Sequence, residues 1–395
     1  MIELKLKNIF IDVEVSHLFV NEKAYGFCSC QNKNEFLIEL DQTLNVVGTT
    51  IANQTVDVGT LTLAGGGLSA AATNAVLTVA GTANVDIDTL DASGLASDLV
   101  ITGLDTGAAA AITMGDTSNK ITIALADAAR DAIDIDGGAG TDSITAVIVS
   151  NVTPGAQNIE TYTVSATAAA TLDLVGSTGV TSLTNTGSSN VLTVTNVGSD
   201  VALTLASTDQ GGTFNYAAST VTGTADARTV SISGVTGGTL NMGTGVESLT
   251  LNSIGSANSL AGVTTGATTI NITGDQNLTI AAAGELTQTT IDASAATGKI
   301  TLQSDAATNA TITTGSGADA ITADGGSAIT ETISLGAGND SLTFDANLAD
   351  ADVLDGGDGT DTLVGIDGNL GGLTSGTTTS NITNFEVVQI SDDLD

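Results

Sequence analysis

Residues 357–363 read Gly-Asp-Gly-Thr-Asp-Thr-Leu, and two similar turns precede them in the chain. Gly-Ala-Gly-Asn-Asp-Ser-Leu occupies 336–342, and Gly-Ser-Gly-Ala-Asp-Ala-Ile occupies 315–321. The final aspartates of these turns are spaced by 21 residues, at Asp319, Asp340 and Asp361. Because a repeated turn at a repeated distance indicates a repeated structural unit, this stretch predicts coils of about 21 residues stacked on one another.

The residue types in each turn suit a hard cation. Glycine permits positive φ and leaves backbone carbonyls uncovered, and the aspartate two positions after the second glycine adds an anionic oxygen. Calcium prefers carboxylate and carbonyl oxygens as ligands. If the turns stack on one edge of a solenoid, a cation between successive coils would join them, so metal binding and coil stacking would be one event.

The sequence from about residue 42 onward consists of short alternating segments separated by Gly, Ser, Asn, Asp and Thr. Typical segments are Leu-Thr-Val at 192–194, Leu-Thr-Leu at 203–205 and Ile-Asn-Ile at 270–272. Alternation over short runs indicates half-buried strands, and their recurrence after about ten residues predicts about two strands per coil. The expected fold is therefore all-β, a parallel β-solenoid or β-roll. The alternative is a series of tandem β-sandwich domains, which also have closely spaced short strands.

Two turns match a longer pattern at every position, and they carry a resemblance to a known family. Gly-Gly-Asp-Gly-Thr-Asp-Thr-Leu at 356–363 and Gly-Gly-Ala-Gly-Thr-Asp-Ser-Ile at 137–144 resemble the nonapeptide repeats of repeats-in-toxin (RTX) proteins. That resemblance implies a β-roll around calcium. The repeats here are not in tandem at nine residues, and the surroundings are rich in Thr, Ala and Val. In this respect the chain looks more like surface-layer (S-layer) proteins and large adhesins exported by type I secretion.

The expected cofactor is Ca²⁺, bound at the glycine-aspartate turns. The expected carboxylate ligands are Asp142, Asp319, Asp340 and Asp361. The positions expected to supply carbonyl geometry or further oxygens are Gly138, Gly140, Gly317, Gly338, Gly359 and Asn339. Secondary candidate ligands are Asp136, Asp324, Asp355 and Asp358.

Composition favours a repeat array with thin aliphatic layers over an ordinary globular core. The 395 residues include 47 glycines, one proline, no tryptophan and 3% aromatic residues. The net charge is −36, from 44 acidic and 8 basic residues, and no Lys or Arg follows Lys299. Between residues 315 and 395 there are 15 acidic side chains. Such a surface does not suit nucleic acid or an anionic membrane, which both attract basic patches, whereas it suits divalent cations.

The chemistry of common enzymes is not indicated. The single histidine, His17, lies in an atypical leader, so Ser-His-Asp or Cys-His catalysis is not expected. Glycine-rich turns here precede aspartate and short strands, which is not the phosphate-binding pattern of a helix start. We expect the protein not to be an enzyme.

The domain organisation is predicted from changes in composition. Residues 1–41 hold both cysteines and form either an N-terminal cap or a foreign leader, with one strand expected at 9–15. Cys28-Ser29-Cys30 is too close for a zinc pair. Three modules are expected after this leader, namely 42–165 with the first full turn, a Thr/Ala/Val-rich solenoid at 166–310, and an RTX-like calcium-binding module at 311–395. A short helix or an alanine-rich coil is expected at 123–132.

A second recurrence has an apolar-Glu-x-apolar core, at Ile159-Glu160, Val246-Glu247 and Phe385-Glu386. Two of these segments follow a Gly-Gly-x-Gly-Thr-Asp turn, which suggests a module of turn, insertion and closing strand. A glutamate on such an edge is expected to point outward.

These observations predict a secreted structural protein of the extracellular cell surface. Its partner would be itself, in a calcium-stabilised lattice or filament, with a cell-surface polysaccharide as a further possible anchor. No N-terminal signal peptide is expected, because charged residues interrupt the apolar ones in Met-Ile-Glu-Leu-Lys-Leu-Lys at 1–7. No membrane insertion is expected, because no apolar run of 18 residues occurs. The resemblance implies export by an uncleaved C-terminal signal; the last residues could belong to one, or the chain could stop within a longer protein. The alternative function is a fragment of a long RTX adhesin whose ligand-binding module lies elsewhere.

Overall fold

A computed structural model describes residues 134–391, apart from 282–285, 307, 324–328, 345–347, 349–350 and 366–380. Toward the N-terminus it describes ten shorter segments, namely 18–20, 23–25, 35–39, 43–48, 56–65, 74–81, 85–95, 98–104, 111–114 and 119–125. The strand expected at 9–15 and the cysteine pair at 28–30 lie outside the described residues.

The described strands form a parallel β-solenoid of about 11 turns with almost no helix. The predicted fold class is thus confirmed, and the β-sandwich alternative is wrong because neighbouring strands of successive coils run in the same direction. Among the described strands, antiparallel pairing is confined to β1 (Leu18–Val20) with β2 (Lys23–Tyr25) and β4 (Thr43–Gly48). The chain divides into two compact units, 1–184 with 192–201, and 185–191 with 202–395. The predicted modules with boundaries at 41, 165 and 310 stay a prediction.

Unit 1 (1–184 with 192–201) contains three sets of parallel strands. The first set continues from β4 through β6 (Asn74–Gly81), β8 (Asp98–Leu104), β10 (Lys120–Leu125), β12 (Ser143–Ile148) and β13 (Thr161–Ala166). The second set is β3 (Glu35–Glu39), β5 (Val56–Gly65), β7 (Val85–Leu95), β9 (Ala111–Thr113) and β11 (Asp134–Asp136). The third set is β14 (Ala170–Asp173) with β16 (Leu192–Val197). β15 (Ser182–Thr186) lies at the boundary of the units. The helix considered at 123–132 is a strand as far as Leu125, and the rest lies outside the described residues.

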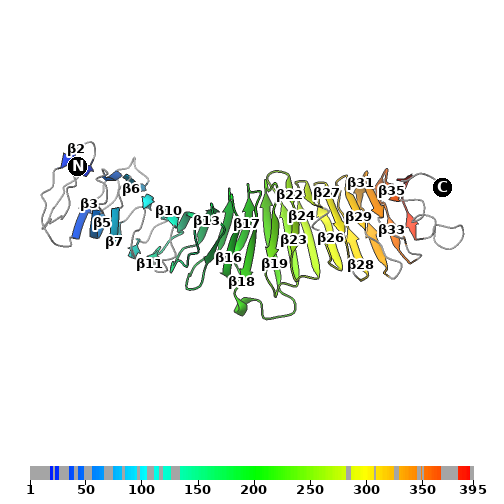
Figure 1. Ribbon diagram of the computed structural model, residues 1–395, viewed down its shortest axis with the longest axis horizontal. Coiled ribbons are helices and arrows are strands. Elements are labelled where there is room, and N and C mark those ends of the chain that lie inside the picture. The colour runs from blue at the N-terminus through cyan, green and yellow to red at the C-terminus, as the bar shows by residue number, and fades with distance from the viewer. Residues whose placement is uncertain are drawn as a thin grey trace. The chain divides into compact units, whose positions relative to one another are not determined.

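Unit 2 (185–191 with 202–395) has two long sets of parallel strands, and Figure 1 shows its coils side by side from green to orange. One set is β17 (Ala202–Ala206), β19 (Ala227–Ser233), β21 (Ser248–Ser253), β24 (Thr269–Gly274), β26 (Thr290–Ala296), β28 (Ala310–Thr313), β30 (Glu331–Ser334), β33 (Val353–Asp355) and β36 (Ile382–Thr383). The other is β22 (Asn258–Leu260), β25 (Leu278–Ile280), β27 (Ile300–Ser304), β29 (Ala320–Ala323), β32 (Ser341–Phe344), β35 (Thr362–Gly365) and β37 (Val387–Ile390).

Unit 2 also contains three short features. β18 (Gly211–Tyr216), β20 (Thr239–Met242) and β23 (Gly262–Thr264) form a third parallel set in its first coils. β31 (Ala337–Gly338) and β34 (Asp358–Gly359) pair within the turns. The short 3-10 helix η2 (Ala218–Thr220) lies in an excursion between β18 and β19. From β24 onward each coil contributes one strand to each long set, which agrees with the two strands per coil predicted from the sequence.

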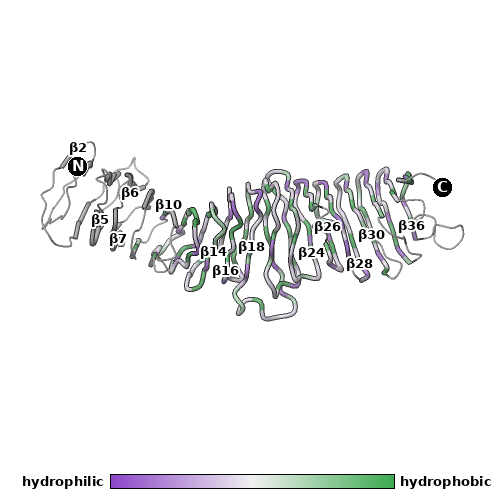
Figure 2. The backbone as a smooth tube through the Cα atoms, viewed as in Figure 1, coloured by the Kyte–Doolittle hydropathy of each residue, from purple (hydrophilic) through white to green (hydrophobic). Residues whose placement is uncertain are grey.

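The core of unit 2 consists of apolar columns that cross the coils. Register places Leu249, Ile270, Ile291, Ile312, Ile333 and Leu354 in one line, and each is at most 1% exposed. Polar residues alternate with them and face outward, which gives the alternating colours along each coil in Figure 2. Each buried Leu or Ile contributes about 1.5–3 kcal/mol, so thin layers suffice without large aromatic residues. No described helix is long and apolar enough to cross a bilayer.

Candidate functional site

The predicted glycine-aspartate turns stack on one edge of unit 2. β31 and β34 pair in parallel with Ala337 opposite Asp358 and Gly338 opposite Gly359. The strands that follow the turns are also in register, because Ser341 pairs with Ala320 and with Thr362. The 21-residue spacing seen in the sequence is therefore the length of one coil, and equivalent turn positions meet in successive coils.

The three aspartates form what we call the aspartate ladder. Oδ1 of Asp319 accepts a hydrogen bond from the backbone N–H of Ile300 at 2.6 Å. Oδ1 of Asp340 accepts from the N–H of Asp319 at 2.7 Å, and Oδ1 of Asp361 accepts from the N–H of Asp340 at 2.8 Å. Each aspartate stands directly before a strand. Each side chain thus satisfies an amide at the start of the strand one coil earlier, which would otherwise be a buried unpaired donor.

Glu386 takes the place of the next aspartate at the C-terminal end of this ladder, and two other glutamates make an equivalent hydrogen bond in other coils. Oε2 of Glu386 accepts from the N–H of Asp361 at 2.8 Å. In unit 1 Oε2 of Glu160 accepts from the N–H of Asp142 at 2.7 Å, and in unit 2 Oε2 of Glu247 accepts from the N–H of Asp226 at 2.9 Å. The sequence reveals this recurrence but gives no partner for it. As expected, none of the three glutamates is buried, since Glu386 is exposed and Glu160 and Glu247 are half-buried. The expectation did not include their partner, which is a backbone amide of the preceding coil in all three cases.

The glycines of the turns are required by the close approach of the coils. A Cβ at Gly338 would collide with the carbonyl oxygen of Gly317, and one at Gly359 would collide with that of Gly338. Both glycines also have φ of 150°. A Cβ at Gly317 would lie 2.6 Å from the carbonyl oxygen of Gly298. The glycine pattern predicted for calcium therefore also has a packing explanation. Gly298 stacks below Gly317 in the same column of glycines, although no aspartate turn follows it.

The electrostatics of the aspartate ladder are unfavourable for three bare carboxylates. Asp319, Asp340 and Asp361 are at most 2% exposed, and the Oδ2 atom of each is buried with no hydrogen-bond partner in the described part of the chain. The pKa of Asp340 is raised to about 6, chiefly by burial and also by the charges of Asp319 and Asp361, although the hydrogen bond from the Asp319 amide lowers it. Burial also raises the pKa of Asp319, while the hydrogen bond from the Ile300 amide and the charge of Lys299 lower it. The ladder favours a proton or a cation beside these oxygens.

The donor set suits calcium in kind, although it is not a dense cluster. Among the described residues no group of three or more His, Cys, Asp or Glu side chains is gathered closely enough to hold a metal ion. The ladder instead offers one buried carboxylate oxygen per coil, from Asp319, Asp340 and Asp361. A calcium ion at this edge would need backbone carbonyls or water as its remaining oxygen ligands.

In unit 1, Asp142 occupies the same position in its turn. It is 1% exposed, and its Oδ1 accepts from the N–H of Asn119 at 2.6 Å. Gly138 and Gly140 have φ of 80° and 122°, as the glycine pattern predicts. The turn at 137–144 thus has positive φ at these glycines, as the turns at 336–342 and 357–363 do, and a buried aspartate at the equivalent position.

The secondary candidates Asp136 and Asp355 have a different role, which we call the Asp–Asn clasp. Oδ1 of Asp136 accepts from the N–H of Gly138 at 3.0 Å and from Nδ2 of Asn158 at 2.8 Å. Oδ1 of Asp355 accepts from the N–H of Gly357 at 3.1 Å and from Nδ2 of Asn384 at 2.6 Å. The two asparagines lie one coil further on and have φ of 53° and 58°. The clasp joins the end of one strand to the turn of the next coil.

The remaining candidates are on the surface or outside the described residues. Asn339 is exposed, and its Oδ1 accepts from the N–H of Thr360 at 3.0 Å. Asp358 is exposed, and its N–H donates to the carbonyl of Gly336 at 2.8 Å. Asp324 lies outside the described residues.

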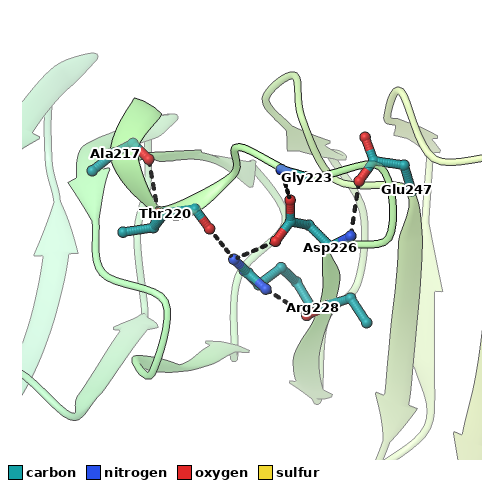
Figure 3. A network of polar contacts seen from close by, with 7 residues as sticks. Ala217, Thr220, Gly223, Asp226, Arg228 and Glu247 are labelled. Atoms are coloured by element: carbon teal, nitrogen blue, oxygen red, sulfur yellow. Dashed lines mark hydrogen bonds and ion pairs between the residues drawn. The ribbon is translucent and has the colours of Figure 1, made fainter.

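A polar network that the sequence did not indicate fixes the excursion between β18 and β19 (Figure 3). Nη2 of Arg228 donates to the carbonyl of Thr220 at 2.5 Å and lies 3.5 Å from Oδ1 of Asp226. Its guanidinium carbon lies 4.9 Å from the ring centroid of Tyr216. Oδ2 of Asp226 accepts from the N–H of Gly223 at 3.0 Å. Arg228 therefore holds the excursion against the coil.

Comparison with known proteins adds no functional information to this geometry. No protein-family model matches the chain, and a search of curated proteins finds no relative.

Proposed function

We propose that this chain is a structural protein of the extracellular cell surface, a subunit of a self-assembling S-layer or surface filament that calcium stabilises. The observation that carries the proposal is the aspartate ladder. It stacks buried carboxylates one coil apart, in a region with 15 acidic residues between 315 and 395 and no Lys or Arg after Lys299. Cations would remove the repulsion and tie each coil to the next.

Calcium would act at the unpartnered Oδ2 atoms of Asp319, Asp340 and Asp361. Bound there, it would supply positive charge to a region that has no Lys or Arg after Lys299, and it would use oxygen ligands only. Extracellular calcium sites bind at about 10⁻⁴–10⁻³ M, so stability would follow the calcium content of the surroundings. The glycines and the amide hydrogen bonds would hold the turns in register whether or not the ion is bound.

The other parts of the proposal rest on the sequence. Secretion by the type I route and anchoring to a cell-surface polysaccharide follow from the resemblance to RTX and S-layer proteins. A non-catalytic role follows from the single histidine and from the lack of a catalytic pattern. The second candidate function is a fragment of a long RTX adhesin, which the same coils and turns would serve equally well.

The test compares thermal unfolding and assembly of the purified chain in millimolar calcium, in magnesium and in chelator. Calcium should raise the unfolding temperature and promote assembly, whereas magnesium should have a smaller effect because it demands tighter octahedral geometry. Asp340→Asn keeps an oxygen for the Asp319 amide but removes the charge, so it should weaken the calcium response. The control is Asp275→Asn, which changes an exposed acid outside the ladder.

Electron microscopy separates the two candidate functions. Ordered sheets, tubes or filaments favour the surface-layer subunit, and isolated particles favour the adhesin fragment. Identical unfolding and assembly in calcium and in chelator would exclude the calcium part of the proposal.

A further inference from the structure

The aspartate ladder begins in a column of residues that is apolar in the earlier coils. Strand register places Leu278 opposite Ile300, and the amide of Ile300 donates to Oδ1 of Asp319 at 2.6 Å. Leu278 and Ile300 are at most 1% exposed. From Asp319 onward the same position in the coil holds the carboxylates of Asp340 and Asp361. The first carboxylate of the ladder therefore has an apolar residue on one side and a second carboxylate on the other.

Lys299 lies where the ladder begins. It directly precedes Ile300 and is exposed. A Cβ at Gly317 would lie 2.8 Å from the Cα of Lys299, so the turn before Asp319 stacks directly on this lysine. Successive coils are about 4.8 Å apart, and the lysine side chain has a stem of four carbons, so its ammonium group can reach the edge of Asp319. Burial raises the pKa of Asp319, and the charge of Lys299 is among the influences that lower it.

The column that contains Lys299 continues along the ladder with uncharged residues. The equivalent positions, each one residue before an aspartate of the ladder, are exposed and hold Ala318, Asn339 and Thr360. Hydrogen bonds within this column confirm its register. The N–H of Lys299 donates to Oδ1 of Asn277 at 2.9 Å, as the N–H of Thr360 does to Oδ1 of Asn339 at 3.0 Å. Since no Lys or Arg follows Lys299, the later intervals of the ladder have no equivalent lysine.

We propose that Lys299 is a built-in counter-ion of the aspartate ladder, which takes the place of a bound cation beside Asp319 and so ends the row of cation sites at this coil. Ions would then bind in the two following intervals, between Asp319 and Asp340 and between Asp340 and Asp361. An ammonium group and a divalent ion meet the same need, which is positive charge beside a buried carboxylate. This inference rests on the proposed calcium role for the number of ions, whereas the effect of the lysine charge on the coils does not depend on calcium.

The first experiment moves the lysine along its column. Ala318→Lys places an ammonium group in the interval between Asp319 and Asp340, as Lys299 stands in the interval before Asp319. The matched control is Thr311→Lys, which adds the same charge at an exposed position of β28, in the other long set of strands. Circular dichroism checks that both variants fold. Equilibrium dialysis against calcium should show one ion fewer bound to Ala318→Lys than to the control or to the wild-type chain.

Hydrogen exchange in chelator at neutral pH gives a readout that needs no calcium. Lys299→Gln should lower the protection of the amides in β27 and β29 about fivefold, because Asp319 loses its neighbouring positive charge. Ala318→Lys should raise the protection of β29 and β32 by a similar factor. Lys120→Gln removes an exposed cation in unit 1 and should leave the protection of these strands unchanged.

The outcomes separate this inference from the proposed function. If the wild-type chain binds calcium, equal ion numbers in Ala318→Lys and Thr311→Lys would overturn the inference and leave the calcium role standing. If no form of the chain binds calcium, the calcium part of the proposed function is wrong, and the exchange data alone decide the inference. Lower protection in Lys299→Gln then supports it, and unchanged protection refutes it.

Discussion

The backbone amide of Asp319 donates to Oδ1 of Asp340 at 2.7 Å, one coil of 21 residues further along the chain. In the same way, the backbone amide of Asp340 donates to Oδ1 of Asp361 at 2.8 Å. A single residue type thereby supplies a side-chain acceptor to the previous coil and a backbone donor to the next. The coils are joined at this edge by hydrogen bonds that a change of one side chain can remove.

Removing the Asp340 acceptor should destabilise these coils. Asp340→Ala leaves the buried amide of Asp319 without a partner, which costs about 1–3 kcal/mol. Asp340→Asn keeps Oδ1 and should retain that stability. Hydrogen exchange of the amides in β29, β32 and β35 measures the effect locally. Equal protection in the alanine and asparagine variants would show that the hydrogen bond carries little of the stability.

The sequence was sufficient for the coil length, the parallel all-β fold and the stacking of the turns, because the period of Asp319, Asp340 and Asp361 is written in the chain. It was not sufficient for the partners of the carboxylates. The 21-residue spacing does not predict which amide donates to Glu386, because Glu386 lies 25 residues after its partner Asp361. The Asp–Asn clasp was missed for the same reason, although an asparagine two positions before a glutamate, as at Asn384 and Asn158, is its signal.

The Arg228 network was missed because a lone arginine in a polar sequence carries no pattern. Its partner atoms are mainly backbone carbonyls, such as that of Thr220, and these have no signature in sequence. The glycine at 298 was missed because Thr-Gly-Lys lacks the aspartate by which the other turns were found.

Gly338→Ala should be among the most destabilising small substitutions in unit 2. The added Cβ would meet the carbonyl oxygen of Gly317, and φ of 150° strains any residue with a Cβ. Together these effects cost about 3 kcal/mol. Gly266→Ala is the matched control, because nothing lies within 4 Å of a Cβ there and its φ is not positive. Urea unfolding measures both variants, and similar midpoints would contradict the packing explanation of the turn glycines.

Arg228→Met should free the excursion at 217–226 while leaving the coils folded. The substitution keeps an aliphatic stem but removes the hydrogen bonds to Thr220 and Ala227 and the charge beside Asp226 and Tyr216. Charge-assisted hydrogen bonds contribute about 1.5–3 kcal/mol. Limited digestion with proteinase K should cut the variant faster within this excursion. Lys120→Met, at an exposed cation in unit 1, controls for the loss of one positive charge and should be digested like the wild-type chain.

The aspartate ladder should make the folded state less stable as the pH rises, which is opposite to the usual effect of carboxylates in folded proteins. The pKa of Asp340 is raised from its ordinary value of 3.8 to about 6 by burial and by its neighbouring carboxylates, and the pKa of Asp319 is also raised. A raised pKa means that the folded state holds the proton more tightly than the unfolded state. The stability from these groups is therefore fully present below about pH 4 and is lost as the pH rises through about 6.

In chelator, coils 315–365 should thus be more stable at about pH 5 than at about pH 7.5. Calcium at the higher pH should restore stability, because the ion takes the place of the proton beside the buried Oδ2 atoms. Asp340→Asn has no proton to lose at this position, so its stability should change less between the two pH values. Hydrogen exchange at both pH values, corrected for the intrinsic rate, checks this for β29, β32 and β35. Greater protection of the wild-type coils at pH 7.5 in chelator would contradict the proposed repulsion within the ladder.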